Sequence, residues 1–244
     1  MMSKQCTIKQ AVSLSGTGLH TGVEVTLRFV PAPVNTGFVF KRTDLAGAPE
    51  IPALAKNVLS TDRGTVLGKG QATVGTVEHV LAALVGMRID NCLIELNAEE
   101  TPIMDGSSKP FVALLEEAGV EEQDTERQYF EITEPITYTA ENGQVELMAV
   151  PAPKYEVSVM VDYGTKVLGS QNASLKVLEN FKEEIANART FSFLHELEYL
   201  LDHGLIKGGD LNNAIVYVDR EVKSESLEKL KKAFKKDNVA VKPN

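Results

Sequence analysis

The residues of this chain best suited to chemistry are Glu78 and His79, which stand side by side in an otherwise apolar helical pattern. An apolar stripe at helical spacing predicts a helix over residues 77–84, with Thr76 placed to cap its first turn. The stripe consists of Val77, Val80, Leu81 and Leu84. Alanines fill the remaining face, so we expect the helix to be covered on two sides, where an unpaired charge is costly.

Two interpretations of the Glu78 and His79 pair are open. In the first, the positive end of the helix dipole keeps His79 neutral, which is the form that binds a metal, and Glu78 reaches a metal-bound water. In the second, Glu78 caps the helix and His79 is a hydrogen-bonded histidine of the core. Spacing alone favours the second, structural interpretation.

Three further clusters carry weaker signals. The glycine-rich segment 16–22 precedes a strand-like pattern rather than a helix, so it is typical of a turn and does not predict a phosphate loop. Asp105 is either the exposed residue of an Asp-Gly turn or a carboxylate that positions a catalytic group without contacting the substrate itself. His195, Glu198 and Asp202 share one helical face, which we interpret as a solvated surface because leucines define the buried face.

Strand and helix patterns follow the same order in both halves of the chain. The first half predicts strands over 7–14, 23–29, 37–41 and 91–97, and helices over 77–84 and 107–119. The second half predicts strands over 129–132, 136–139, 144–150, 155–162 and 214–218, and helices over 174–188 and 193–203. Between the halves, the acidic segment 121–126 has no apolar anchor. The sequence therefore predicts an α+β fold with two similar domains, residues 1–122 and 128–244.

The composition is that of an ordinary globular protein of 244 residues, 43% hydrophobic and 24% charged. A net charge of -9 and a pI near 5.1 argue against nucleic acid as a partner, because phosphate neutralisation needs clustered Lys and Arg. No apolar run reaches membrane-spanning length and the first residues lack a signal peptide, which predicts a cytoplasmic protein without a transmembrane segment. Cys6 and Cys92 have no zinc-finger spacing and form no disulfide framework.

Four motifs, taken in order along the chain, resemble those of the UDP-3-O-acyl-N-acetylglucosamine deacetylases. They are Gly18-Leu-His-Thr-Gly22, Thr76-Val-Glu-His79, Pro102-Ile-Met-Asp-Gly-Ser107 and Ala188-Arg-Thr-Phe191. These enzymes are zinc-dependent amidases of the committed step of lipid A synthesis. The resemblance implies two α+β domains, each a β-sheet with a pair of helices, with the helices sandwiched between the two sheets.

The resemblance also implies a role for each matching residue. His79 would be a zinc ligand, Glu78 the general base toward the zinc-bound water, and Thr190 the hydroxyl that stabilises the tetrahedral oxyanion. Asp105 remains the supporting carboxylate. Six further residues would contact the substrate, with the acyl chain and sugar near Leu19, Phe191 and Phe193, and uridine near Asp162 and Tyr163. His20 completes this substrate-binding group.

The sequence departs from the family pattern after residue 203. The family has a later segment with a second zinc-binding His, an Asp four residues on and a distal His that acts as general acid, whereas no His follows His203 here. We therefore expect an amino-terminal fragment that is inactive alone. The alternative is a non-catalytic fragment that binds the UDP-sugar or the acyl chain without metal. Residues 220–244 predict a basic amphipathic helix, and some relatives carry a fused or downstream acyl-carrier-protein dehydratase.

Overall fold

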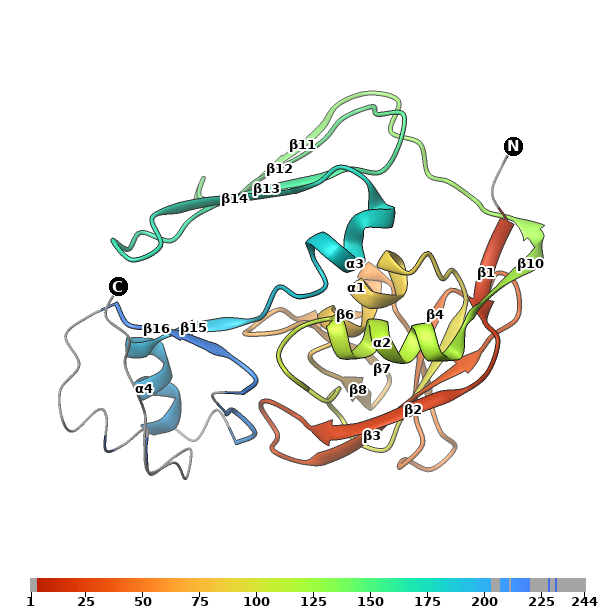
Figure 1. Cartoon of the computed structure of the whole chain (residues 1–244), viewed down its shortest axis with the longest axis horizontal. Helices are drawn as coiled ribbons and strands as arrows, with labels where there is room; N and C mark the ends of the chain where they lie inside the picture. The colour runs from red at the N-terminus through yellow and green to blue at the C-terminus, as the bar shows by residue number, and fades with distance from the viewer. Residues whose placement is uncertain (1–3, 203–206, 211, 220–227, 229–230, 232–244) are drawn as a thin grey trace.

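The computed structural model describes residues 4–202, 207–210, 212–219, 228 and 231, and these form an α+β fold (Figure 1). The predicted fold class is confirmed. The predicted basic helix over 220–244 lies outside the described residues. Among the described helices, none combines the length and the apolar character needed to cross a membrane.

The largest sheet has five strands and forms the base of the first half. Its strands, in spatial order, are β2 (Val12–Thr17), β3 (Glu24–Pro31), β9 (Cys92–Leu96), β4 (Phe38–Arg42) and β5 (Glu50–Pro52). All neighbours are antiparallel except β4 and β9, which pair in parallel. Apolar residues alternate with polar ones along β3 and β9, so each strand turns one apolar face toward the core.

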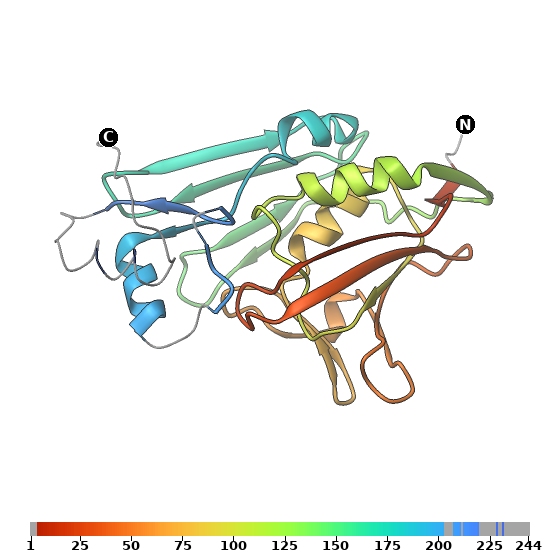
Figure 2. The ribbon, with the colours of Figure 1, turned by 60° about the horizontal axis from the view of Figure 1, so that its bottom comes forward.

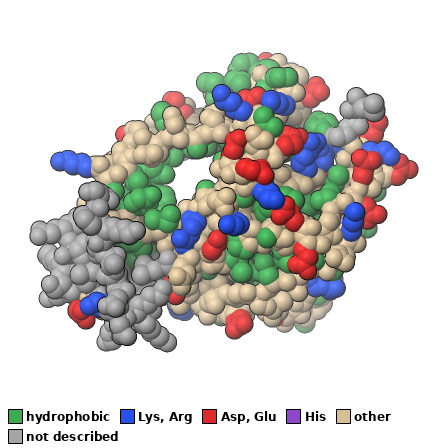
Figure 3. Space-filling model, in the orientation of Figure 1, with side chains coloured by type: hydrophobic (Ala, Val, Ile, Leu, Met, Phe, Trp, Pro, Cys, Tyr) green, Lys and Arg blue, Asp and Glu red, His purple; other side chains and the backbone are tan. Residues whose placement is uncertain are grey.

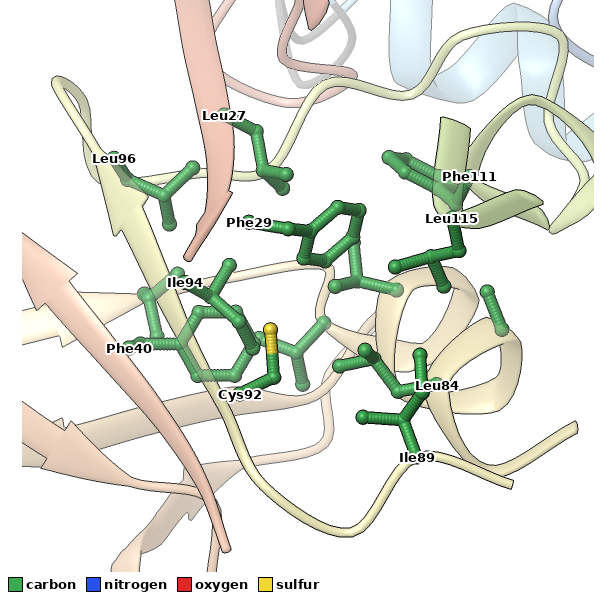
Figure 4. Packing of buried hydrophobic residues seen from close by; sticks show 14 of the residues in the cluster. Leu27, Phe29, Phe40, Leu84, Ile89, Cys92, Ile94, Leu96, Phe111 and Leu115 are labelled. Atoms are coloured by element: carbon green, nitrogen blue, oxygen red, sulfur yellow. The ribbon is translucent and has the colours of Figure 1, made fainter. Parts of the chain in front are cut away.

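Helices α1 (Glu78–Gly86) and α2 (Lys109–Ala118) cover the apolar face of this sheet. Figure 4 shows Phe29 of the sheet pointing toward Phe111 and Leu115 of α2, with Phe40 of the sheet and Leu84 of α1 in the same cluster. All five side chains are fully buried. Burial at this level, at about 25 cal/mol per Å² of apolar surface, is the main stabilising contribution to the first half.

Two smaller sheets flank the five-stranded one. Strand β1 (Lys4–Ile8) pairs with β10 (Val120–Glu126), while β6 (Val58–Ser60), β7 (Val66–Lys69) and β8 (Ala72–Val74) follow the short helix η1 (Ala55–Asn57). The acidic segment 121–126, where the sequence predicts the boundary between the halves, is part of strand β10, because backbone pairing with β1 needs no apolar side chains. The position of a domain boundary there stays a prediction.

The second half consists of two hairpins followed by a short β-α-β unit. The hairpins are β11 (Ile136–Thr139) with β12 (Glu146–Ala149), and β13 (Val157–Asp162) with β14 (Ser170–Leu175). Next come η2 (Leu178–Asn180) and α3 (Phe181–Glu184), then β15 (Phe191–Phe193), α4 (Leu194–Asp202) and β16 (Ile215–Tyr217). Strands β15 and β16 are parallel, with α4 as the crossover.

Two predictions in this half are wrong, and one strand was not predicted. The helix over 174–188 is instead the end of β14 followed by η2 and a four-residue α3. The strand over 129–132 is not formed. The polar strand β14 was missed because its residues Ser170, Gln171 and Asn172 carry no apolar alternation.

The helices lie between β-structures, as Figures 1 and 2 show: the five-stranded sheet is on one side of α1 and α2, and the hairpins with α3 are on the other. Each hairpin has an apolar face that is largely exposed, with Tyr138 and Leu147 on one and Val159 on the other. Figure 3 shows apolar side chains along the rim of an opening between the hairpins and the rest of the molecule. Division into two similar domains stays a prediction.

Buried Arg42 pairs with the more exposed Asp44 and also ties the sheet to β8, the strand that precedes α1. We expect Asp44→Asn to break the ion pair. Arg42, 7% exposed, donates to both Asp44 oxygens at 2.9 and 2.7 Å and to the Thr73 carbonyl at 2.6 Å. Losing one oxygen leaves buried N–H groups unpaired, so the free energy of unfolding should fall by about 1–3 kcal/mol in urea titrations.

The contribution of the Arg42–Asp44 ion pair to stability also depends on pH. The hydrogen bond from Arg42 holds the pKa of Asp44 below its ordinary value of 3.8. The stabilisation is therefore present above pH 3.8 and is lost as pH falls through the lower pKa of the folded state. Asp124→Asn is the control, because Asp124 pairs with Lys4 in the open and should leave stability unchanged. Equal effects of the two variants would contradict the prediction.

Candidate functional site

Glu78 lies at the first turn of α1 and is exposed to solvent. The backbone N–H of Thr65, in the loop between β6 and β7, donates to Glu78 Oε1. The predicted cap by Thr76 is wrong, because Val77 is the N-cap residue without a side-chain cap and the Thr76 hydroxyl donates instead to Glu100. The prediction that α1 is covered on two sides also fails at Glu78, which leaves this carboxylate free to meet a ligand.

His79 follows on α1 and is half-buried. Burial lowers the pKa of His79 from its ordinary value of 6.5, while the negative charges of Glu78 and Asp105 oppose that shift. A lowered pKa favours the neutral ring near pH 7, and its main cause is burial rather than the helix dipole invoked from the sequence. Asp105 is held in place by Ser107, whose backbone N–H and hydroxyl donate to Asp105 Oδ1 at 3.0 and 2.7 Å.

The glycine-rich loop 18–22 brings His20 to Gly64, the backbone position that Glu78 also approaches. A methyl group placed on Gly64 would lie 3.8 Å from His20 Nε2, 3.8 Å from Glu78 Oε1 and 3.7 Å from Thr76 Oγ1, so these three groups converge on one backbone position. His20 Nε2 is buried and has no hydrogen-bond partner among the described residues. Such an atom is placed to accept or donate a hydrogen bond when a ligand arrives.

A cavity of about 280 Å³ opens next to this convergence. It is lined by loop 18–22, by Arg63, and by residues of β15, α4, β16 and the segment before β16. The lining residues are Leu19, His20, Arg63, Thr190, Phe191, Ser192, Glu196, Leu197, Leu200, Gly209, Asp210, Ala214 and Val216. Apolar side chains dominate the wall, which suits an apolar ligand with a few polar contacts.

Thr190 is fixed at the wall of this cavity by backbone hydrogen bonds. Its N–H donates to the Gly106 carbonyl at 2.7 Å, and its carbonyl accepts from Ile215 N–H at 3.0 Å. Arg189 Nε donates to the Asp105 carbonyl at 2.7 Å. A side chain on Gly106 would overlap the Asn213 carbonyl, so glycine permits this close approach. The second half therefore docks directly onto the loop that contains Asp105.

Aromatic rings cluster beside the cavity. Tyr163 meets Phe191 edge-on at 5.4 Å and Phe193 at 6.2 Å between ring centroids, and Phe193 stacks on His195 at 5.8 Å. Phe193 is buried and does not line the cavity. Asp162 also stays away from the cavity and accepts a hydrogen bond from Gly164 N–H at 2.9 Å. Of the predicted substrate-binding residues, Leu19, His20 and Phe191 thus share the cavity wall.

Residues 5–235 match the family model described as LpxC: UDP-3-O-acyl N-acetylglycosamine deacetylase. The chain belongs to the LpxC family. It is 46% identical over 231 residues to a bifunctional enzyme LpxC/FabZ of Chlorobaculum tepidum, which covers 94% of this chain and 50% of the relative. A similar match, 45% identical, is found with the bifunctional enzyme LpxC/FabZ of Porphyromonas gingivalis.

The chain is also similar to a relative of the LpxC family whose name does not include FabZ. The chain is 43% identical over 227 residues to the UDP-3-O-acyl-N-acetylglucosamine deacetylase of Pseudomonas entomophila, covering 92% of this chain and 74% of the relative. The chain thus spans about half the length of the bifunctional relatives it matches. The resemblance inferred from the four motifs is confirmed.

The residues present only partly fit the zinc ion expected for this LpxC-family chain. His79 offers a neutral imidazole, a donor that zinc accepts readily. Within the described ranges, however, no three His, Cys, Asp or Glu side chains converge as a metal site would require. His195 pairs instead with Asp219 through Nδ1, with 45% of its side chain exposed. The side chains of Glu198 and Asp202 lie outside the described residues.

We therefore expect the 244-residue chain to retain far less than one equivalent of zinc after dialysis against a weak chelator. A protein zinc site normally has three or four protein ligands, and one imidazole holds the ion weakly. Elemental analysis of the dialysed chain measures the ratio, with His79→Gln as the reference for non-specific metal. Near-equimolar zinc in the wild-type chain, lost in His79→Gln, would contradict the expectation and would require further ligands, with His20 the first to test.

Sequence reasoning missed Arg63 and Glu100, which the structure brings to the site. Arg63 has a left-handed backbone, with φ of 60°, and lines the cavity mouth. No pattern marked it. Glu100 could have been found, because the alternation of buried residues along β9 continues through Ala98 and reaches Glu100, an acidic side chain at an inward position.

Proposed function

We propose that this chain supplies the general base, one zinc ligand and the acyl-chain cavity of a deacetylase that releases acetate from UDP-3-O-(3-hydroxyacyl)-N-acetylglucosamine in lipid A synthesis. Membership of the LpxC family supports the reaction class. The observation that carries the proposal is the position of Glu78 and His20 around Gly64, next to an apolar cavity.

Glu78 is suited to accept the proton of the attacking water. It is exposed, and the Thr65 N–H engages Oε1, which orients the carboxylate and leaves the other oxygen for a water. A positioned general base contributes about 100- to 10,000-fold in rate. Zinc bound at His79 would polarise the acetamide carbonyl and acidify a water molecule.

Thr190 is suited to stabilise the negative charge that develops on the amide oxygen. Its backbone is fixed on both sides, by Gly106 and Ile215, so its position on the cavity wall costs little reorganisation when charge appears. A hydroxyl in a largely apolar cavity interacts more strongly with an oxyanion than one in water.

The cavity supports an acyl chain as part of the substrate. Leu19, Phe191, Leu197 and Leu200 present apolar surface from three different elements, and each buried methylene of a fatty chain contributes about 0.8 kcal/mol. Tyr163, at the end of β13 and packed on Phe191, offers a ring edge for a uracil base. Asp162 is proposed only as a neighbour of that base.

The experiment is an acetate-release assay with zinc supplied. The acylated UDP-sugar is the substrate, and UDP-N-acetylglucosamine without the acyl chain is the comparison. The assay uses the 244-residue chain and a chimera in which it replaces the matched part of the Pseudomonas entomophila relative. We expect the chimera to release acetate from the acylated substrate alone. A zinc-loaded, folded chimera that releases none contradicts the proposal.

A second candidate function is a metal-free fragment that binds the UDP-sugar or acyl chain without catalysis. The incomplete ligand set among the described residues favours it for the chain by itself. Saturable substrate binding without zinc and without acetate release would support it. The names of the bifunctional relatives support the further proposal that the whole protein includes a fused dehydratase activity, and a cytoplasmic location stays a prediction.

A further inference from the structure

Glu100 is a buried acid with no role in the reaction described above. It is 3% exposed and continues the inward alternation of β9. No ion pair of Glu100 occurs within the described ranges, so its carboxylate is accommodated by hydrogen bonds. A buried carboxylate needs such partners, because leaving it unsatisfied costs several kcal/mol.

The donors to Glu100 come from two separate segments. The backbone N–H of His20 donates to both oxygens, at 3.0 and 3.1 Å, and Thr21 donates to Oε2 through its N–H at 2.9 Å and its hydroxyl at 2.8 Å. From the other segment, the Thr76 hydroxyl donates to Oε1 at 2.8 Å. One carboxylate therefore joins loop 18–22 to Thr76, two residues before the start of α1.

Thr76 is held in an unusual backbone conformation by this contact. Its φ is +55°, a left-handed value that a β-branched residue rarely adopts because its side chain crowds the backbone. Glu100 fixes its hydroxyl, and the Thr101 hydroxyl donates to its carbonyl. Because Thr76 lies two residues before Glu78, this conformation sets the direction in which α1 begins.

Loop 18–22 passes directly over the carboxylate. A side chain at Gly18 would overlap Glu100 Oε2 and the Thr21 hydroxyl, so a glycine is required there. The two groups that Glu100 anchors, His20 and Thr76, are those that converge with Glu78 beside Gly64.

We propose that Glu100 is a positioning residue that holds loop 18–22 and Thr76 in register, so that the His20 ring and the Glu78 carboxylate both stay next to Gly64. The expected effect on catalysis rests on the proposed function. The expected effect on the positions of His20 and Thr76 rests on geometry alone. A carboxylate accepts from all its donors at once, whereas an amide would turn an N–H group toward one of them.

The test compares Glu100→Gln with Glu99→Gln, a neighbouring exposed acid, by NMR of the nitrogen-labelled chain. The chain has four histidines, so the ring signals of His20 can be assigned by substitution. We expect Glu100→Gln to shift the His20 ring signals and the amides of residues 18–22 and 76, and Glu99→Gln to leave them in place. In the chimera, kcat should fall about 10- to 100-fold with KM changed little.

The NMR readout does not depend on deacetylation, so an inactive wild-type chimera counts against the proposed function alone. If Glu100→Gln does not fold, Thr21→Val and Thr76→Val each remove one hydroxyl donor and keep the acid. Each should shift the His20 ring signals by a smaller amount. Unmoved His20 signals in the folded variants, or a loss of thermal stability without any change at His20, would overturn the proposal in favour of a purely structural role.

Discussion

Replacing Glu78 by Gln is expected to lower kcat for acetate release by about 100- to 10,000-fold, the largest effect on activity expected for this chain. Glutamine keeps an oxygen to accept the Thr65 N–H, so the loop between β6 and β7 should stay in place. It removes only the ability to accept the proton of the attacking water. Acetate release by the chimera, measured at saturating substrate, gives kcat directly.

Two controls separate loss of the base from loss of structure. Glu117→Gln changes an exposed acid on α2 and should leave kcat unchanged. Zinc content and thermal stability of Glu78→Gln should match those of the unmodified chimera. Turnover within threefold of the unmodified chimera would exclude Glu78 as the base and return the Glu78 and His79 pair to a structural interpretation.

The largest effect on stability is expected at the contact between Gly86 of α1 and Phe181 of α3. Phe181 is 6% exposed, and a side chain at Gly86 would overlap its ring. Glycine to alanine in a helix ordinarily stabilises by about 1 kcal/mol. Here Gly86→Ala should instead destabilise by about 1–3 kcal/mol, because the ring must move, and Phe181→Ala should cost about 3–5 kcal/mol.

A double-mutant cycle measured by urea titration tests this contact. With Phe181 already replaced by alanine, the added methyl at position 86 meets no ring, so Gly86→Ala should become neutral or stabilising. The change of sign is the decisive result. If Gly86→Ala is destabilising by the same amount in both backgrounds, Phe181 is not the group that the methyl displaces, and the docking of α3 on α1 needs another explanation.

The sequence by itself determined the elements with strong periodicity. Apolar spacing correctly placed these elements, because apolar residues recur at regular intervals on one face of each. They are helices α1 and α2 and strands β3, β4, β9, β11 and β13. The motifs at 18–22, 76–79, 102–107 and 188–191 were enough to identify the family, because residue identities at fixed spacing can be read directly from the sequence.

Only the tertiary structure decided how those motifs meet. Strand β10 and most of β14 have few apolar side chains, and backbone pairing defines them, with distant β1 for β10 and with the neighbouring hairpin strand β13 for β14. Thr76 does not cap α1: the N-cap residue is Val77, and the Thr76 hydroxyl is held by Glu100, which lies 24 residues away along the chain. Helix periodicity fixed which face of α1 is apolar, but the convergence of His20, Glu78 and Gly64 depends on contacts between loops, whose geometry no local pattern encodes.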